Sequence, residues 1–156
     1  MAKEIERKFL VVDEQWRGAA DAGLYMSQGY LQSGAQSSIR VRIAGDKAWL
    51  NIKSATLDIA RQEYEYEIPC TDAREILATL CQGLVVEKTR YHVPFGGHLW
   101  EVDVFAGDNT GLVVAEIELK DENESFELPP WAGEEVSHHA RYYNVCLAKQ
   151  PYKNWR

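Results

Sequence analysis

The feature that most constrains this chain is an alternation of charged and apolar residues with a period of two. It is clearest at 38–43, 63–68 and 101–104. Successive side chains of a β-strand point to opposite faces of the sheet, so each segment predicts a strand with one charged and one apolar face. Glycine-containing turns separate many of these segments. The same pattern recurs at 4–9, 50–53, 88–91 and 115–120, with an eighth candidate strand near 25–32.

Helices are expected in only two places. Asp72 to Cys81 has apolar residues at helical spacing and follows Thr71, which we take as the N-cap residue. The tail from Gly133 to Lys149 is a weaker helical candidate. The expected fold class is therefore mainly β (α+β), with a few flanking helices that include one near the C-terminus.

Length, charge and cysteine content restrict the setting. The 156 residues suit one domain, expected to span 1–156, and a net charge of −7 argues against nucleic acid or a membrane surface as partner. Cysteines 70, 81 and 146 have no C-x-x-C spacing and fit a reducing compartment. The charged N-terminus lacks an apolar signal region, and no apolar run approaches the ~20 residues of a membrane span. We expect a cytoplasmic enzyme.

The charged strand faces separate by sign. Glu63 and Glu65 share an acidic face, and Arg40 and Arg42 share a basic one. One interpretation is that these faces meet water. The other is that about eight antiparallel strands close into a barrel, which removes exposed edges and is wide enough for one small ligand. With the apolar faces outward against the helices, the charged faces line the lumen. Water or ions must then fill it, because an unpaired buried charge costs several kcal/mol.

Both signs of charge are expected in this lumen. Carboxylates are hard ligands for Mg²⁺ or Mn²⁺, and arginine and lysine bind phosphate oxygens. The mixture suits an anionic ligand that carries metal ions. The carboxylates are Glu4, Glu6, Glu63, Glu65, Glu67, Glu101, Asp103, Glu116 and Glu118, and the cations are Lys8, Arg40, Arg42, Lys53, Lys88, Arg90 and Lys120. We expect Glu67 and Lys120 to be solvated rim residues and Glu101 to pair with a neighbouring cation.

A resemblance to a known family appears when these segments are taken in order. Glu4-Ile5-Glu6-Arg7-Lys8 fits the E-x-E-x-K signature of the CYTH superfamily, also called triphosphate tunnel metalloenzymes. The order of the later segments follows that family along almost the whole chain. The chain is most similar to the short bacterial members, several of which act as inorganic triphosphatases. The later segments are Arg40-Val41-Arg42, Asn51-Ile52-Lys53, Arg61 to Glu65, Glu87 to Tyr91, Glu101 to Phe105 and Glu116-Ile117-Glu118.

The resemblance implies an eight-stranded tunnel and a role for each charged group. Mg²⁺ or Mn²⁺ would be bound by Glu4, Glu6, Glu116, Glu118 and Asp103, and Glu63 and Glu65 could hold a second metal or orient water. A triphosphate would be held by Lys8, Arg40, Arg42, Lys53, Lys88 and Arg90. Arg141 matches an arginine in a helix that plugs one tunnel mouth.

The catalytic group is left open between two candidates. Lys8 and Tyr30 match a Lys–Tyr pair proposed to assist catalysis in the bacterial subgroup, with Tyr30 as proton acceptor. An unperturbed tyrosine has a pKa of about 10 and is a poor base unless a cation lowers it. A metal-bound water positioned by a carboxylate would need no tyrosine base, and Tyr30 would then only pack or hydrogen-bond.

The resemblance favours metal-dependent hydrolysis of inorganic tripolyphosphate to pyrophosphate and phosphate, by a monomer or homodimer. A class IV-type adenylate cyclase, or a triphosphatase acting on nucleotides or thiamine triphosphate, would share the tunnel. A barrel that binds polyphosphate without cleaving it could lose the metal carboxylates, which this chain keeps. A lipocalin-like carrier would need an apolar lumen.

Overall fold

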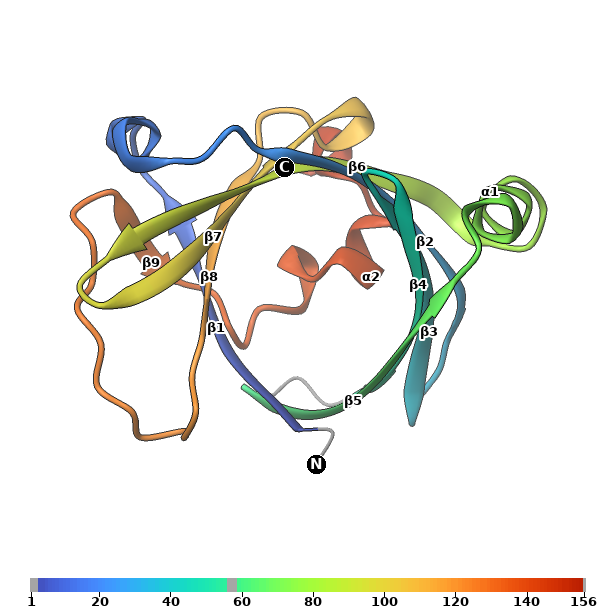
Figure 1. The fold of residues 1–156 in the computed structure, drawn as a ribbon, viewed down its shortest axis with the longest axis horizontal. Helices are drawn as coiled ribbons and strands as arrows, with labels where there is room; N and C mark the ends of the chain where they lie inside the picture. The colour runs from blue at the N-terminus through green and yellow to red at the C-terminus, as the bar shows by residue number, and fades with distance from the viewer. Residues whose placement is uncertain (1–2, 56–58, 156) are drawn as a thin grey trace.

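The computed structural model describes residues 3–55 and 59–155, and its core is a closed barrel (Figure 1). One antiparallel sheet has the strand order β5-β4-β3-β2-β6-β7-β8-β1-β9, and β5 also pairs with β1. That last pairing closes β1 to β8 into a ring and confirms the predicted eight-stranded barrel. The strands are β1 (Lys3–Val11), β2 (Leu24–Ser33), β3 (Ser37–Ala44), β4 (Lys47–Ser54), β5 (Ala60–Ile68), β6 (Gln82–Phe95), β7 (His98–Phe105), β8 (Val113–Glu118) and β9 (Ala132–Glu135).

Strand β1 closes the barrel because its two halves have different partners. Its first residues pair with β5, where Glu4 lies opposite Arg61. Its next residues pair with β8, where Glu6 lies opposite Glu118 and Lys8 opposite Glu116. Strand β9 pairs with the end of β1, outside the ring. The E-x-E-x-K segment therefore lies between two other charged strands.

The outward faces of β1, β7 and β8 carry a buried apolar cluster, as predicted. Phe9, Trp100 and Ile117 are buried in a cluster on the outside of β1, β7 and β8. Trp16 from a short 3₁₀ helix (Gln15–Ala19) and Trp131 from the segment before β9 cover this cluster. Removing this apolar surface from water stabilises the fold and leaves the charged faces directed into the barrel.

Helix α1 (Cys70–Thr79) lies on the outside of β3 and β4, where Ala73 packs against Val41 and Ala48 (Figure 1). It begins before the predicted Asp72, and the prediction of Thr71 as N-cap residue is wrong. The N-cap position is Pro69, whose carbonyl accepts the first helical hydrogen bond from the Ala73 amide at 3.1 Å. No side chain caps this end of the helix.

The C-terminal tail differs from the helix predicted for 133–149. It forms β9, a 3₁₀ helix (Ala140–Tyr142) and the short helix α2 (Asn144–Leu147). Figure 1 shows α2 inside the ring of strands, not on the outer wall where the alternation pattern placed both helices, although the resemblance also implied a tail helix at one tunnel mouth. Its Leu147 is buried against Val86 and Val114. One end of the lumen is therefore apolar and filled by α2. No helix among the described residues is long and apolar enough to cross a membrane.

Gly29 of β2 allows α1 to pack closely on the barrel. A Cβ atom at this position would lie 2.6 Å from the Cys81 Sγ atom and 2.9 Å from the Leu77 Cδ2 atom. We expect Gly29→Ala to destabilise the fold by about 1–3 kcal/mol through overpacking. That corresponds to a fall in Tm of roughly 2–4 °C per kcal/mol in a chain of this size, measurable by thermal unfolding.

Gly18→Ala is the matched control for this change. A Cβ atom at Gly18 would have no heavy atom within 4 Å, so its Tm should stay close to that of the wild type. Equal Tm values for Gly29→Ala and the wild type would show that α1 moves away from β2 without cost.

Candidate functional site

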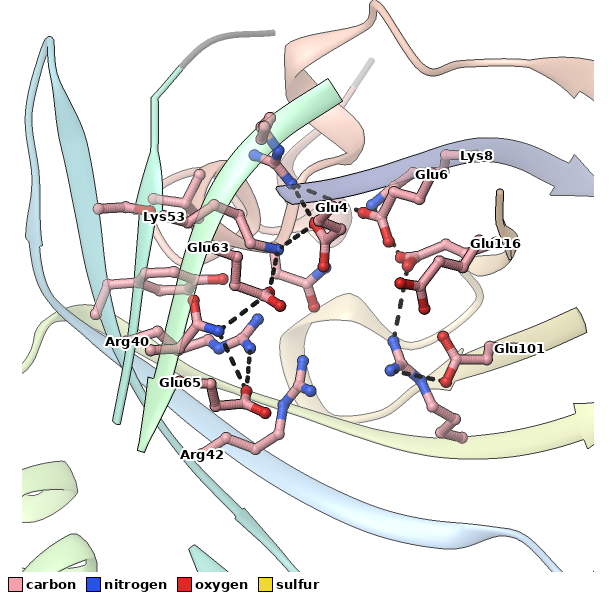
Figure 2. A pocket seen from close by; sticks show the side chains of 18 of the residues that line it. Glu4, Glu6, Lys8, Arg40, Arg42, Lys53, Glu63, Glu65, Glu101 and Glu116 are labelled. Atoms are coloured by element: carbon pink, nitrogen blue, oxygen red, sulfur yellow. Dashed lines mark hydrogen bonds and ion pairs between the residues drawn. The ribbon is translucent and has the colours of Figure 1, made fainter. Parts of the chain in front are cut away.

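The lumen holds a cavity of about 190 Å³ whose lining comes from all eight barrel strands and from α2. Figure 2 shows acidic and basic side chains from different strands pointing into this common space. The barrel thus gathers residues that are far apart in the sequence. The lining residues are Glu4, Glu6, Lys8, Tyr30, Ser38, Arg40, Arg42, Asn51, Lys53, Arg61, Glu63, Glu65, Lys88, Arg90, Glu101, Glu116, Glu118, Asn144 and Val145.

On one side of the cavity, Lys53 lies between two carboxylates (Figure 2). Its Nζ atom is 2.9 Å from Glu4 Oε1 and 3.3 Å from Glu63 Oε2. The carboxyl groups of Glu4 and Glu63 also hydrogen-bond to each other. Burial raises the pKa of Glu4. Burial also opposes the charged form of Glu63. The hydrogen bond that Glu63 accepts from Glu4 and the charge of Lys53 outweigh the effect of burial and lower the pKa of Glu63 to about 2.

On the other side, Glu6 and Glu116 form a second acidic pair joined by a hydrogen bond. Burial, followed by the charges of Glu116 and Glu4, raises the pKa of Glu6 to about 8. Burial opposes the charged form of Glu116 too, but Lys8 and Arg90 outweigh it, and its pKa falls well below the usual range. Lys8 Nζ is 3.2 Å from Glu116 Oε1. Glu6 therefore carries a proton at neutral pH while Glu116 stays charged.

Asp103 is buried against Lys88 and Arg90 and is not among the lining residues of the cavity. The side chain has no exposed surface, and its oxygens accept bonds from Lys88 Nζ at 2.7 Å, Arg90 Nε at 2.8 Å and Arg90 Nη2 at 2.9 Å. Burial alone would raise the pKa of Asp103, but Arg90 and Lys88 lower it to about 2. Asp103 thus holds two cavity cations in place. Its predicted role as a metal ligand has no support from this position.

A cluster of cations lies on β3. Burial, together with the nearby Arg40 and Arg90, lowers the pKa of Arg42 to about 9. Arg40 is only 8% exposed, and its sole ion pair within the described chain is at 3.7 Å, from Nη2 to Glu65 Oε2. Its Nε atom is buried without a hydrogen-bond partner. Arg40 therefore has a donor available for an anionic ligand.

Most of the predicted site residues meet at the cavity, and two do not: Asp103 and Arg141. Arg141 is exposed, with its guanidinium carbon 3.9 Å from the centre of the Trp155 ring. Lys8 and Tyr30 both line the cavity. The Lys8 ammonium contacts Glu116 and the Tyr142 carbonyl, and among the described residues it makes no hydrogen bond to the Tyr30 hydroxyl.

Several lining residues were not predicted. Ser38 and Asn51 lie on the polar faces of the predicted segments 38–43 and 50–53 but were not named as site residues, because they carry no charge. Arg61 precedes Glu63 by two positions, so a longer alternating pattern would have found it. Arg61 Nη2 lies 3.7 Å from Glu6 Oε1. Asn144 carries no such signal because it comes from α2, and its Oδ1 atom accepts a bond from Lys88 Nζ at 3.1 Å.

The carboxylates suit a hard divalent cation in their chemistry. No three Asp, Glu, His or Cys side chains of the described residues converge as a ready metal site. They form instead the pairs Glu4–Glu63 and Glu6–Glu116, each joined by a hydrogen bond. Two carboxylates this close repel each other when both are charged, and a divalent cation relieves that repulsion through oxygen coordination. The donor set therefore fits Mg²⁺ or Mn²⁺, provided the acids lose their shared protons.

Fold and site together define a class of protein: a closed antiparallel barrel with a charged, ligand-sized cavity in its lumen. Residues 2–148 match the CYTH domain family. The chain is 49% identical over 156 residues to an inorganic triphosphatase of Acetivibrio thermocellus, covering 100% of this chain and 99% of that relative. It is 40% identical over 152 residues to an inorganic triphosphatase of Nitrosomonas europaea, covering 93% and 96%. The chain belongs to the CYTH domain family.

A solved structure gives the same result. The crystal structure of an inorganic triphosphatase matches this fold with a TM-score of 0.66 and 38% sequence identity, covering 95% of each chain. Barrel and sequence therefore indicate the same family.

Proposed function

We propose that this chain is an inorganic triphosphatase that hydrolyses tripolyphosphate to pyrophosphate and phosphate in the barrel lumen. The observation that carries the proposal is the cavity itself, where cations and acid pairs face one another. The similarity to triphosphatases over the full chain supports the same substrate class. A compact, highly charged linear anion fits a lumen of about 190 Å³.

The cations would bind the phosphate chain. Arg40 and Arg42 come from β3, Lys53 from β4, and Lys88 and Arg90 from β6, so they approach a ligand from several sides of the barrel. Arginine binds phosphate through paired N–H groups and lysine as a point charge. Holding the phosphates in line and neutralising their charge is most of what phosphoryl transfer requires.

The metal in the proposal is Mg²⁺ or Mn²⁺. Dependence on a divalent metal is general among CYTH triphosphatases. Glu4, Glu6, Glu116 and Glu118 would hold it, with Glu63 and Glu65 able to hold a second ion. A bound divalent cation supplies charge neutralisation at phosphoryl oxygens and lowers the pKa of bound water. The Glu6 carboxyl must release its proton to serve as a ligand, since its pKa is about 8.

Lys8 and Tyr30 would act at the reacting phosphate. The Lys8 ammonium is held by Glu116 and lies 4.7 Å from the centre of the Tyr143 ring, so it is oriented by β8 and the tail. The part of Arg141 in closing a tunnel mouth stays a prediction, as do the cytoplasmic location and the choice between monomer and homodimer.

The alternatives have less support. A cyclase or nucleotide triphosphatase must also hold a base, and Tyr30 is the one aromatic side chain among the cavity's described lining residues. A barrel that only binds polyphosphate would need no acid pairs, which this lumen keeps. A lipocalin-like carrier requires an apolar lumen, and here only the end filled by α2 is apolar.

Phosphate release decides among these functions. Tripolyphosphate, ATP and thiamine triphosphate are each incubated with the protein and Mg²⁺ or Mn²⁺, with a chelator as control. We expect the fastest release from tripolyphosphate and none with the chelator. Dominant formation of cyclic AMP from ATP would support a cyclase. Tight tripolyphosphate binding without turnover would support a binding barrel.

Arg40→Ala tests the substrate-binding part of the proposal. We expect weaker tripolyphosphate binding, because a hydrogen bond to a charged group is worth about 1.5–3 kcal/mol, or roughly 10- to 100-fold in KM. Steady-state kinetics measures the change. Arg74→Ala, at an exposed position of α1, is the matched control and should behave as the wild type. Unchanged kinetics of Arg40→Ala would place substrate away from β3.

A further inference from the structure

Gln28 on β2 is a wholly buried polar residue, 0% exposed, that links two cavity residues. Its Oε1 atom accepts a hydrogen bond from Arg42 Nε at 2.8 Å. Its Nε2 atom donates a hydrogen bond to the Tyr30 hydroxyl oxygen at 3.1 Å. The amide is therefore a bridge between a cation and a hydroxyl that both line the lumen.

The direction of these bonds follows from the chemistry of arginine. Side-chain amide oxygens and nitrogens are often interchangeable in a structure. Here they are not, because a guanidinium only donates hydrogen bonds and must face the amide oxygen of Gln28. The amide nitrogen then faces Tyr30 and can only donate. The bridge fixes Tyr30 as an acceptor from Gln28.

The hydroxyl hydrogen of Tyr30 is consequently left for another partner. Among the described residues, its one hydrogen bond is the bond received from Gln28. The residue is buried yet lines the cavity, so the space available to its hydrogen is the lumen. Buried hydroxyl groups are rarely left without an acceptor, which indicates one on the ligand.

We infer that Gln28 is a positioning residue that makes the Tyr30 hydroxyl a hydrogen-bond donor to a phosphate oxygen of the bound triphosphate. This inference rests on the proposed function and specifies the chemistry of that site. The same amide holds Arg42 beside Tyr30, so a neutral and a charged donor approach the substrate together. Tyr30 then acts by stabilising charge on a phosphate oxygen, and not by accepting a proton.

The test compares variants that break different parts of the bridge. Gln28→Met keeps the side-chain volume and removes both bonds. Gln28→Glu keeps an acceptor for Arg42, but its carboxylate cannot donate to Tyr30 and would take the hydroxyl hydrogen for itself. Tyr30→Phe removes the hydroxyl alone. Gln62→Met, at an exposed position on β5, is the matched control. Thermal unfolding establishes that each variant is folded.

We expect each of the three variants to lower kcat/KM for tripolyphosphate by roughly 10- to 100-fold, with the larger part of the loss in kcat. The double variant Gln28→Met/Tyr30→Phe should be no worse than the poorer single variant. In a plot of kcat/KM against pH, Tyr30→Phe should keep the rise with increasing pH that the wild type shows, because Tyr30 does not accept a proton in the reaction. If the Gln28 variants do not fold, the kinetics and pH profile of Tyr30→Phe still decide.

Three results would overturn the inference: loss of the rise with increasing pH in Tyr30→Phe, additive losses in the double variant, or wild-type kinetics in Gln28→Glu. A wild type that releases no phosphate would contradict the proposed function instead. In that case the affinity for tripolyphosphate is measured by titration calorimetry. Equal affinities of Tyr30→Phe and the wild type would overturn the inference that Tyr30 donates a hydrogen bond to the ligand.

Discussion

Glu6→Gln should reduce phosphate release from tripolyphosphate by at least ~100-fold while leaving the barrel folded. The amide cannot replace a carboxylate as a charged metal ligand, and a bound metal supplies several kcal/mol of charge stabilisation in the transition state. The change is otherwise mild, because glutamine has the shape of a protonated glutamate, and Glu6 is protonated at neutral pH in the metal-free protein. Phosphate release and thermal unfolding measure the two effects.

The stability of the metal-free protein should respond to Glu6→Gln in a pH-dependent way. The pKa of Glu6 is about 8 in the fold and near 4.5 in the unfolded chain, because burial first, and then Glu116 and Glu4, disfavour the charge. Between these values the folded state binds more protons than the unfolded state, so the Glu6 contribution to stability falls as the pH rises from about 4.5 to 8. Glu6→Gln removes this fall and should have a higher Tm than the wild type at pH 8.

The controls separate metal binding from the fold. The Tm of each protein is measured by thermal unfolding, once in a chelator and once with Mn²⁺. We expect Mn²⁺ to raise the Tm of the wild type much more than that of Glu6→Gln. Glu75→Gln, at an exposed position of α1, should match the wild type throughout. If Glu6→Gln is already unfolded in the chelator before heating, Glu6 is needed for the fold, and this outcome would contradict its role as a metal ligand.

The barrel could be predicted from the sequence because one physical rule produces both its walls and its lumen. Alternation places Arg40 and Arg42 on one face of β3 and Glu63 and Glu65 on one face of β5. The apolar strand faces must be buried by packing, and charged faces directed inward must be paired with charges of opposite sign. A closed barrel meets both requirements. The structure confirms the closure and brings these residues to one cavity.

What could not be predicted depends on long-range pairing. Asp103 shares the inward face of β7 with Glu101, but alternation cannot show that β6 brings Lys88 and Arg90 onto its carboxylate. The apolar residues of the C-terminal tail recur with no strong periodicity. The local sequence therefore did not indicate that α2 lies inside the barrel. Thr71 has the chemistry of an N-cap residue, yet the bond accepted by Pro69 starts the helix two residues earlier.

Asp103→Asn should lower the stability of the protein by about 3–5 kcal/mol, since it leaves two cations without their buried partner. In a chain of this size each kcal/mol is worth about 2–4 °C in Tm. Asparagine keeps the volume of Asp103, so packing is unchanged, and the loss reports on the charge together with the hydrogen bonds that an amide nitrogen cannot accept. Because the pKa of Asp103 is about 2 in the fold, its contribution is present above about pH 4 and is lost as the pH falls toward 2. The Tm difference between variant and wild type should shrink over that range.

The same variant decides between the ion pair and the metal ligand as the role of Asp103. The Tm of the wild type and of Asp103→Asn is measured in the presence of a chelator, where a metal ligand contributes nothing to stability. We expect Asp103→Asn to show its full loss of stability under these conditions. Asp46→Asn, in the exposed turn between β3 and β4, should leave the Tm unchanged. A Tm loss that appears only with Mg²⁺ or Mn²⁺ would contradict the ion-pair role. Catalysis should fall as well, because the asparagine amide nitrogen cannot accept a hydrogen bond, and Arg90 then keeps at most one of the two bonds that hold its guanidinium.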